Sequence, residues 1–450
     1  MPECGSWVNN RVIRDQHDNS NERLSNLHLG YGCIPFDDMP FNSSLVGHNP
    51  KLWDVLDCIN PSNRKHEIFA RLIRNNTEID GQLFTAVKDI SGFDNIETLI
   101  ATYNNTLYYK HQGRKLELDK GHVYIKEYKD DTQFILGRLK ELASNGVSNY
   151  SHSVKAWLQT TVHVIDCDEK RKALVQMFER SRCALIYGSA GTGKSTLINH
   201  ISHFFPDKSK LYLANTNPAV DNLKRRVTAS NCEFSTIAKF VKKKDVATEY
   251  DLLIIDECST VSNRNMRAIL EKAAFKLLVL AGDVFQIESI QFGNWFSTAR
   301  SFIPATSVFE LTRPYRTNNN GLLELWKRVR NMDETILEIL AKQGYSTTLD
   351  ASILEHAETD EIILCLNYDG LYGINNVNRF LQESNPNQAI SWGLQLYKVD
   401  DPILFNESER FAPLIYNNMK GKIVWIAVLE NRIQFDIELD KVINGMDADD

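Results

Sequence analysis

The sequence lacks the features that mark membrane, secreted and zinc-binding proteins. It has no run of 18 apolar residues, so no segment is long enough to cross a bilayer. Its start does not show the basic and then apolar pattern of a secretion signal. The eight cysteines include no Cys-x-x-Cys pair and indicate neither a zinc site nor a disulfide framework. We therefore expect reduced thiols in a cytoplasmic protein that does not contact a membrane.

The chain also lacks an excess of positive charge. Its net charge of −7 at pH 7 argues against a protein that binds polyanions over its whole surface. Residues 206–244 are the exception, because they hold nine Lys and Arg against three Asp and Glu. The composition is that of a globular protein, and 450 residues predict two to four domains.

The clearest motif is a glycine-rich segment between an apolar run, 183–187, and a helical pattern. The pattern Gly-x-x-x-x-Gly-Lys-Ser suits phosphate, because glycines let backbone N–H groups converge and the helix start is positive. We expect Lys194 to reach the β- and γ-phosphates and Ser195 to bind Mg²⁺. The alternative is a turn that binds nothing. The predicted nucleotide-binding residues of the loop are Gly188, Ser189, Ala190, Gly191, Thr192, Gly193, Lys194, Ser195 and Thr196.

Polar residues follow further apolar runs at 210–214, 251–256 and 276–281. Runs of this length predict parallel strands buried on both faces, and such sheets bind ligands at their carboxyl ends. Asp256 is placed to hold Mg²⁺ with Ser195, and Glu257 to deprotonate the attacking water. Gln286 follows the third run and can contact the γ-phosphate or the water. For each of these side chains the alternative is an ordinary polar turn or strand end.

A basic segment follows the strand at 210–214. Small polar side chains and a basic helix suit nucleic-acid phosphates, with a turn and a solvated helix face as the alternative. The residues predicted to contact nucleic acid here are Asn215, Thr216, Asn217, Lys224, Arg225 and Arg226. Further on, Arg316 is a candidate for a cation that stabilises the transition state, with a surface salt bridge as the alternative.

The order of these motifs resembles that of superfamily 1 P-loop helicases of the RecD-like branch, over about residues 162–445. The resemblance implies ATP and Mg²⁺ as cofactors, single-stranded DNA or DNA with a single-stranded tail as partner, and 5′ to 3′ movement. It places Arg316 at the nucleotide and Asn417 at the DNA. It also implies that Phe292 and Trp295 stack on bases, and the alternative is that both rings lie in the core.

The expected fold class is α/β, with tandem RecA-like P-loop domains built on parallel sheets. Residues 1–150 are predicted to form an α-rich domain, a candidate contact for a protein partner, with strands at 107–109 and 123–125 around a turn at 119–121. Residues 144–151 are predicted to be a linker. Residues 162–309 would form the first RecA-like domain. Residues 310–450 would form the second, apparently incomplete, with a strand at 361–366 and an SH3-like insertion at about 397–440.

Two features of the sequence differ from the motif pattern of the family. The family reads adenine with a glutamine before the phosphate loop, whereas this chain has Lys170 near that place, which leaves the preference for ATP open. The family's last DNA-contacting and arginine motifs are not found, so we expect residues 1–450 to bind ATP but to unwind duplex DNA poorly alone. The alternatives are a nucleic-acid-binding subunit that does not unwind, and a P-loop regulator or kinase that binds no nucleic acid.

Overall fold

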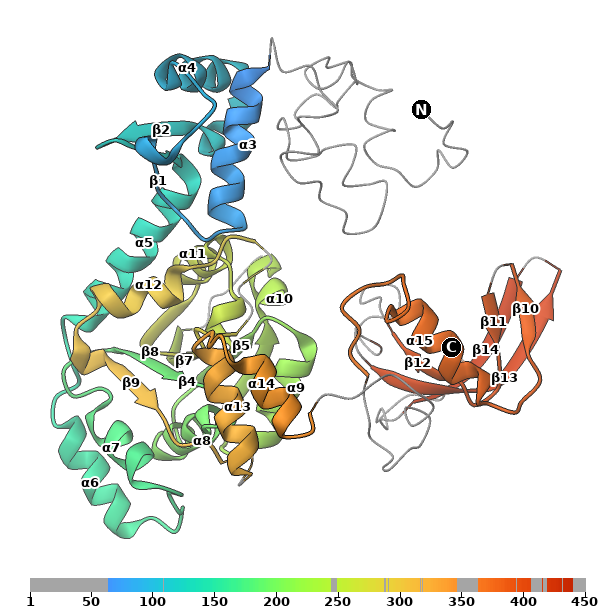
Figure 1. The fold of residues 1–450 in the computed structure, drawn as a ribbon. Helices are drawn as coiled ribbons and strands as arrows, with labels where there is room; N and C mark the ends of the chain where they lie inside the picture. The colour runs from blue at the N-terminus through green and yellow to red at the C-terminus, as the bar shows by residue number, and fades with distance from the viewer. Residues whose placement is uncertain are drawn as a thin grey trace. The chain divides into compact units, whose positions relative to one another are not determined.

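The computed structural model divides the chain into two compact units, Met1–Arg316 and Thr317–Asp450 (Figure 1). It describes residues 64–107, 109–243, 249–286, 291–315, 319–345, 363–393, 395–405, 419–430 and 432–439, and the single residues 289, 317 and 415.

A six-stranded sheet forms the centre of the first unit. The strand order is β6-β5-β7-β8-β4-β9, and every neighbouring pair is parallel. The three further runs predicted as strands all lie in it, which confirms the expected P-loop type of sheet. The strands are β4 (Cys183–Gly188), β5 (Lys210–Ala214), β6 (Cys232–Thr236), β7 (Glu249–Ile255), β8 (Ala274–Gly282) and β9 (Val308–Leu311).

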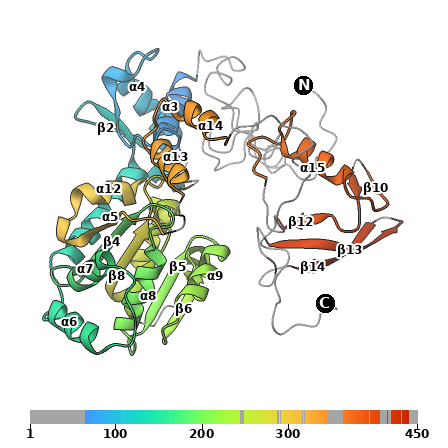
Figure 2. The ribbon, with the colours of Figure 1, turned by 60° about the horizontal axis from the view of Figure 1, so that its bottom comes forward.

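Helices cover both faces of this sheet because its strands are apolar on both sides. Leu185 of β4 packs into one core cluster and its neighbour Ile186 into another, as side chains alternate along a strand. Figure 2 shows the helices around the sheet. They include α7 (Asp168–Gln176), α8 (Lys194–Phe204), α9 (Asn217–Arg226), α10 (Ile237–Lys242), α11 (Asn263–Lys272) and α12 (Trp295–Phe302), with short 3₁₀ turns η4 (Cys258–Thr260) and η5 (Ala305–Ser307).

The N-terminal described residues build a smaller core of their own, in which Phe69 and Ile73 pack against Ile100 and Val123. Its strands pair in the order β1-β3-β2, all antiparallel. Strand β3 pairs with β1 and β2, and the described residues of the strand predicted at 107–109, Leu107 and Tyr109, lie in no strand, so the prediction is wrong for them. The predicted turn at 119–121 does join β2 and β3. The elements are α3 (Lys65–Glu78), β1 (Thr85–Ala86), η2 (Val87–Asp89), α4 (Ile96–Thr106), η3 (Tyr109–Arg114), β2 (Leu116–Asp119) and β3 (His122–Ile125).

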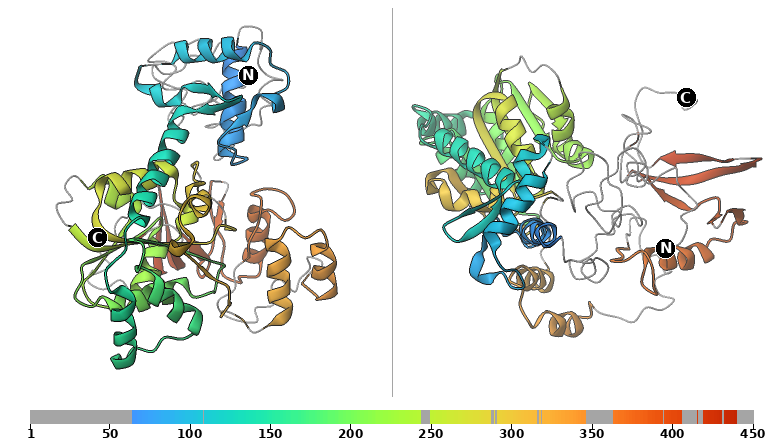
Figure 3. Two further views of the ribbon diagram at one scale, coloured as in Figure 1. Left: turned by 90° about the vertical axis from the view of Figure 1, so that its left-hand side faces the viewer. Right: turned by 90° about the horizontal axis from the view of Figure 1, so that it is seen from above.

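Helices α5 (Lys126–Ala143) and α6 (Tyr150–Thr160) contribute side chains to the hydrophobic clusters on the two faces of the sheet (Figures 1 and 3). Ile135 and Leu139 of α5 lie in the cluster on one face, and Tyr150 of α6 in the cluster on the other. Between the helices, Val147 N–H donates to the Phe178 carbonyl at 2.7 Å. Residues 144–151 are therefore no linker, and the predicted domain boundary at residue 150 is wrong.

The described residues of the second unit form two antiparallel sheets, β10-β11 and β12-β13-β14. Strand β14 lies within the segment predicted to be an SH3-like insertion. The strand predicted at 361–366 is not formed in its described part, 363–366, so the prediction is wrong there. Leu364 and Leu366 are 88% and 100% exposed. An SH3-like form of the larger sheet stays a prediction. The elements are α13 (Asn320–Arg330), α14 (Ile336–Lys342), α15 (Ile374–Glu383), β10 (Ile390–Trp392), β11 (Gln395–Tyr397), β12 (Pro402–Leu404), β13 (Lys420–Leu429) and β14 (Arg432–Leu439).

No helix in the described part of the chain is long and apolar enough to span a bilayer.

Candidate nucleotide-binding site

The loop between β4 and α8 has the geometry of a phosphate-binding loop. Gly191 and Gly193 have φ values of 82° and 85°, in the left-handed region that glycine adopts without strain. At Gly188 a Cβ atom would lie 2.6 Å from the Thr192 hydroxyl, so this position also excludes side chains. Thr192 closes the loop by donating from its hydroxyl to the Ser189 carbonyl at 2.8 Å. A closed glycine-rich loop at the start of a helix is the arrangement in which backbone N–H groups bind anions.

Lys194 supplies a positive charge inside this loop. Its Nζ atom donates to the carbonyl oxygens of Gly188 at 2.8 Å and Ser189 at 3.2 Å. A phosphate at the loop would compete with these carbonyls for the ammonium group, because charge-assisted hydrogen bonds are the stronger ones. The position agrees with the role predicted for Lys194.

Ser195 and Asp256 meet across the site. The Ser195 hydroxyl donates to Asp256 Oδ2 at 3.5 Å, and the Glu257 N–H donates to Asp256 Oδ1 at 2.9 Å. Burial raises the pKa of Asp256, against hydrogen bonds and the Lys194 charge, which lower it. A buried carboxylate beside a hydroxyl offers the oxygen ligands that hard divalent cations prefer. The two residues therefore fit Mg²⁺, the ion predicted for them.

Glu257 lies next to Asp256 in a backbone conformation that is unusual for glutamate. Its φ is 54°, and the 3₁₀ turn η4 begins directly after it, with the Thr260 N–H bound to its carbonyl at 2.9 Å. Burial and the neighbouring Asp256 raise the pKa of its carboxyl group, while Lys194 lowers it. A raised pKa makes a carboxylate a stronger acceptor of a proton from water. Strain of this kind is typical of functional positions.

Gln286 lies in a turn just past β8. Its N–H donates to the Asp283 carbonyl at 3.1 Å, and its side chain is exposed. The turn is fixed from inside by the buried carboxylate of Asp283, which accepts from the Phe285 N–H at 3.1 Å. A contact from Gln286 to the γ-phosphate stays a prediction.

The residues predicted to bind nucleic acid divide between the two ends of α9. Asn215 donates from Nδ2 to the Thr260 carbonyl at 3.1 Å, and Thr216 caps α9 by accepting from the Ala219 N–H, so both side chains hold local structure. Asn217 is exposed at the first turn. Lys224, Arg225 and Arg226 are exposed in the last turn of this ten-residue helix. At about 1.5 Å per residue, the basic turn lies over 10 Å from Asn217.

Phe292 and Trp295 are not available for stacking on bases, and this prediction is wrong. Trp295 is fully buried, and its Nε1 donates to the Val261 carbonyl at 2.7 Å. Phe292 is 6% exposed, and its ring lies 4.9 Å from the ring of Tyr128 on α5. The alternative, that both rings lie in the core, is the one observed. Because α5 comes from far upstream, nothing in the residues around Phe292 indicates this contact.

Two further predicted residues, Arg316 and Asn417, lie outside the described residues.

The motifs did not predict a polar cluster that contacts the phosphate loop through Lys170, which lies beside Gly193. Lys170 is 1% exposed, and its ammonium group forms an ion pair with Asp166. The other oxygen of Asp166 is bound by His200 Nε2 at 2.8 Å, and His200 in turn contacts His163 at 2.8 Å. The spacing of Asp166 and Lys170, four residues apart at a helix start, was the available signal in the sequence.

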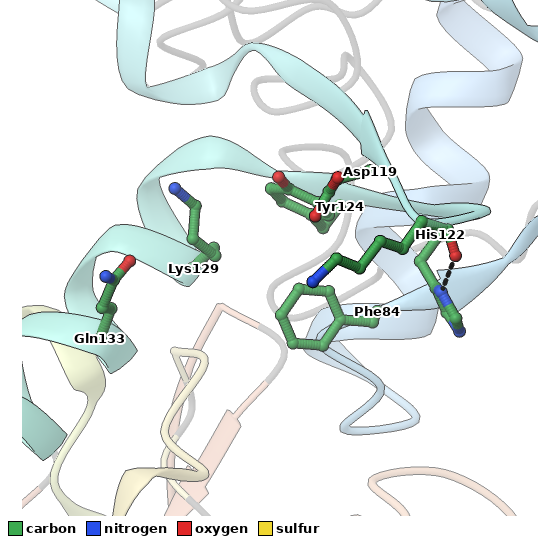
Figure 4. A pocket seen from close by; sticks show the side chains of 7 residues that line it. Phe84, Asp119, His122, Tyr124, Lys129 and Gln133 are labelled. Carbon is green, nitrogen blue, oxygen red and sulfur yellow. Dashed lines mark hydrogen bonds between the residues drawn. The ribbon is translucent and has the colours of Figure 1, made fainter.

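A shallow pocket of about 460 Å³ lies away from this site, between the β2–β3 turn and α5. Figure 4 shows the Phe84 ring below that of Tyr124, with Lys129 to one side. The centroids of the two rings are 5.2 Å apart. Lys129 is paired with Asp130 at 2.6 Å, so carboxylates offset the positive charge here. The pocket therefore does not extend the basic surface of α9.

Parts of this chain are similar to known proteins. The model of a family described as "AAA domain" matches residues 167–351. No curated protein matches the chain in sequence. Among solved structures, Pif1 from Bacteroides bound to single-stranded DNA is similar at 16% identity and a TM-score of 0.38, over 61% of this chain and 72% of that one. Pif1 helicase from Candida albicans is similar at 16% identity and a TM-score of 0.34, over 61% of this chain and 76% of that one.

The family match covers the phosphate loop and the Asp256–Glu257 pair, the parts of the chain whose geometry fits a bound triphosphate. Residues 167–351 therefore carry a nucleotide-binding domain of the P-loop type.

Proposed function

We propose that the chain is a motor of superfamily 1, which hydrolyses a nucleoside triphosphate and moves on single-stranded DNA from 5′ to 3′. The observation that carries the proposal is the 3.5 Å contact between Ser195 and Asp256, with Glu257 directly beside it. This arrangement joins a phosphate-binding loop to a candidate base. The resemblance implies ATP as the substrate.

Each residue of the site has a separate role in hydrolysis. Backbone N–H groups of the loop and the Lys194 ammonium hold the β- and γ-phosphates in place. Ser195 and Asp256 would hold Mg²⁺, which supplies positive charge to the phosphate oxygens when bound. Glu257 accepts a proton from the water that attacks the γ-phosphate, a role for which its raised pKa suits it.

Contact with DNA is assigned to surfaces at the carboxyl edge of the sheet and to α9. Asn217 is exposed at the start of α9, and the three cations of its last turn are exposed at its end. Phosphate contacts of this kind are independent of base sequence, as a motor that passes along a strand requires. The N-terminal part, with its own core, is a candidate surface for a protein partner.

Displacement of streptavidin from biotinylated oligonucleotides tests the proposed movement. A motor that moves 5′ to 3′ displaces streptavidin from the 3′ end when a triphosphate is present, and the Glu257→Gln variant does not. Displacement from the 5′ end alone would show that the protein moves from 3′ to 5′. Hydrolysis without displacement from either end would favour the alternative, a nucleic-acid-binding subunit that does not translocate.

A further inference from the structure

The phosphate loop has two different flanks in the sheet. On one side β4 pairs with β8, and beyond β8 lies β7, which Asp256 and Glu257 directly follow. On the other side β4 pairs with β9. The terminal phosphate has to lie on the first side, because the candidate cation ligand and base are there. The nucleoside of the same triphosphate therefore leaves the loop on the β9 side.

Residues of α7 and of the segment after β9 line this second flank. Glu169 of α7 accepts from the Thr312 N–H at 3.0 Å, which joins α7 to the end of β9. The Tyr315 N–H donates to the Gly191 carbonyl at 2.8 Å, which joins the same segment to the loop. Lys170 lies between them. A Cβ atom on Gly193 would collide with its Nζ, so the ammonium group touches the loop.

The Lys170 ammonium is held in place by its neighbours. Asp166 pairs with it and is itself bound by His200 at 2.8 Å. The Tyr315 ring lies over Nζ at 4.6 Å and is 41% exposed, so a base that enters from this side has to displace the ring before it contacts Lys170. An ammonium group has three donors and no acceptor. Only one of these donors is needed for Asp166.

We propose that Lys170 reads the nucleotide base and that guanine is accepted at least as well as adenine. Guanine presents two neighbouring acceptors, O6 and N7, which a lysine can bridge. Adenine presents N7 beside an amino group, and that amino group finds no acceptor on an ammonium. An amide side chain at the same place would both accept from the amino group and donate to N7. This specificity deepens the proposed function and rests on it.

The test compares ATP and GTP as competitors of a fluorescent triphosphate on the full chain, in the presence of Mg²⁺. The unmodified protein is expected to bind GTP with a Kd equal to or lower than that of ATP. Lys170→Gln should shift the ratio of the two Kd values toward ATP by about tenfold or more. Lys172→Gln is the matched control, because Lys172 is exposed on the same helix and its replacement should leave the ratio unchanged.

Two results would overturn the inference while the proposed function stands. One is that the unmodified protein binds ATP tenfold more tightly than GTP, a measurement that does not depend on whether any variant folds. The other is that Lys170→Gln, shown to be folded by circular dichroism, keeps the original ratio. Failure to bind either triphosphate would refute the proposed function and the inference together.

Discussion

At the scale of single residues, Glu257 separates nucleotide binding from hydrolysis. Glu257→Gln leaves Lys194, Ser195 and Asp256 in place, so the triphosphate should still bind with nearly unchanged affinity. Hydrolysis should fall by about 10²–10⁴-fold, the usual contribution of a general base. Lys194→Ala should instead lose tight binding, because it removes the ammonium group from the loop. Fluorescence titration and phosphate release measure the two effects separately.

Glu271→Gln is the control for this comparison, because Glu271 is exposed on α11 and away from the loop. It should hydrolyse at the rate of the unmodified chain. Normal hydrolysis by the Glu257→Gln variant would show that another group deprotonates the water.

His163 should couple the stability of the first unit to pH. Burial and the neighbouring His203 and His200 lower the pKa of His163 to about 4, from an ordinary value of 6.5. The unfolded chain therefore binds more protons between these values, and the free energy of unfolding should fall as the pH falls from 6.5 toward 4.

Replacement of His163 by glutamine should weaken this pH dependence, as measured by urea unfolding across the same range. His152→Gln serves as the control, because His152 is exposed on α6. Equal slopes for the His163→Gln variant and the unmodified chain would contradict the assignment.

At the scale of elements, α12 and the loop before it belong to the core. Trp295→Ala would leave a cavity and remove the hydrogen bond to Val261, so it should lower the free energy of unfolding by about 3–5 kcal/mol. Phe302→Ala, at the exposed end of α12, should change it much less. Urea denaturation of both variants measures the difference. A Trp295→Ala variant that is as stable as the unmodified chain but binds DNA more weakly would support stacking of Trp295 on a base.

The last turn of α9 is expected to bind DNA phosphates. Replacing Lys224, Arg225 and Arg226 together by alanine should lower the dependence of log affinity on log salt by about 0.7 for each phosphate that is no longer neutralised. Fluorescence anisotropy with a labelled oligonucleotide at several salt concentrations measures this slope. Replacing Arg171 and Lys172, two exposed cations of α7, is the control. An unchanged slope in the α9 variant would place the DNA elsewhere.

Strands β4, β5, β7 and β8 of the central sheet could be predicted because each is a short apolar run with a functional motif at its end, whereas β6 and β9 were not predicted. Asp256 and Ser195 are 61 residues apart, yet their meeting followed from the rule that parallel strands bring their carboxyl ends to one edge. The strand order, which separates the two flanks of the loop, could not be predicted in the same way. That order depends on pairing between distant segments and has no local signal.

At the scale of the whole molecule, the misplaced boundary at residue 150 has one physical cause. Helix α5 carries a buried face that matches the sheet, with Ile135 and Leu139 in its core, while its first turn continues directly from β3. A helical pattern shows that a face is apolar but not which element covers it. For the same reason Phe292 was assigned to DNA, although Tyr128 of α5 covers it.

The rate of triphosphate hydrolysis with and without single-stranded DNA tests the central claim most directly. The claim is that the site at Lys194, Asp256 and Glu257 drives movement on DNA, so the strand should raise the rate severalfold or more, and this increase should vanish in the Glu257→Gln variant. A steady rate that single-stranded DNA does not change, over a range in which the oligonucleotide binds, would contradict the account.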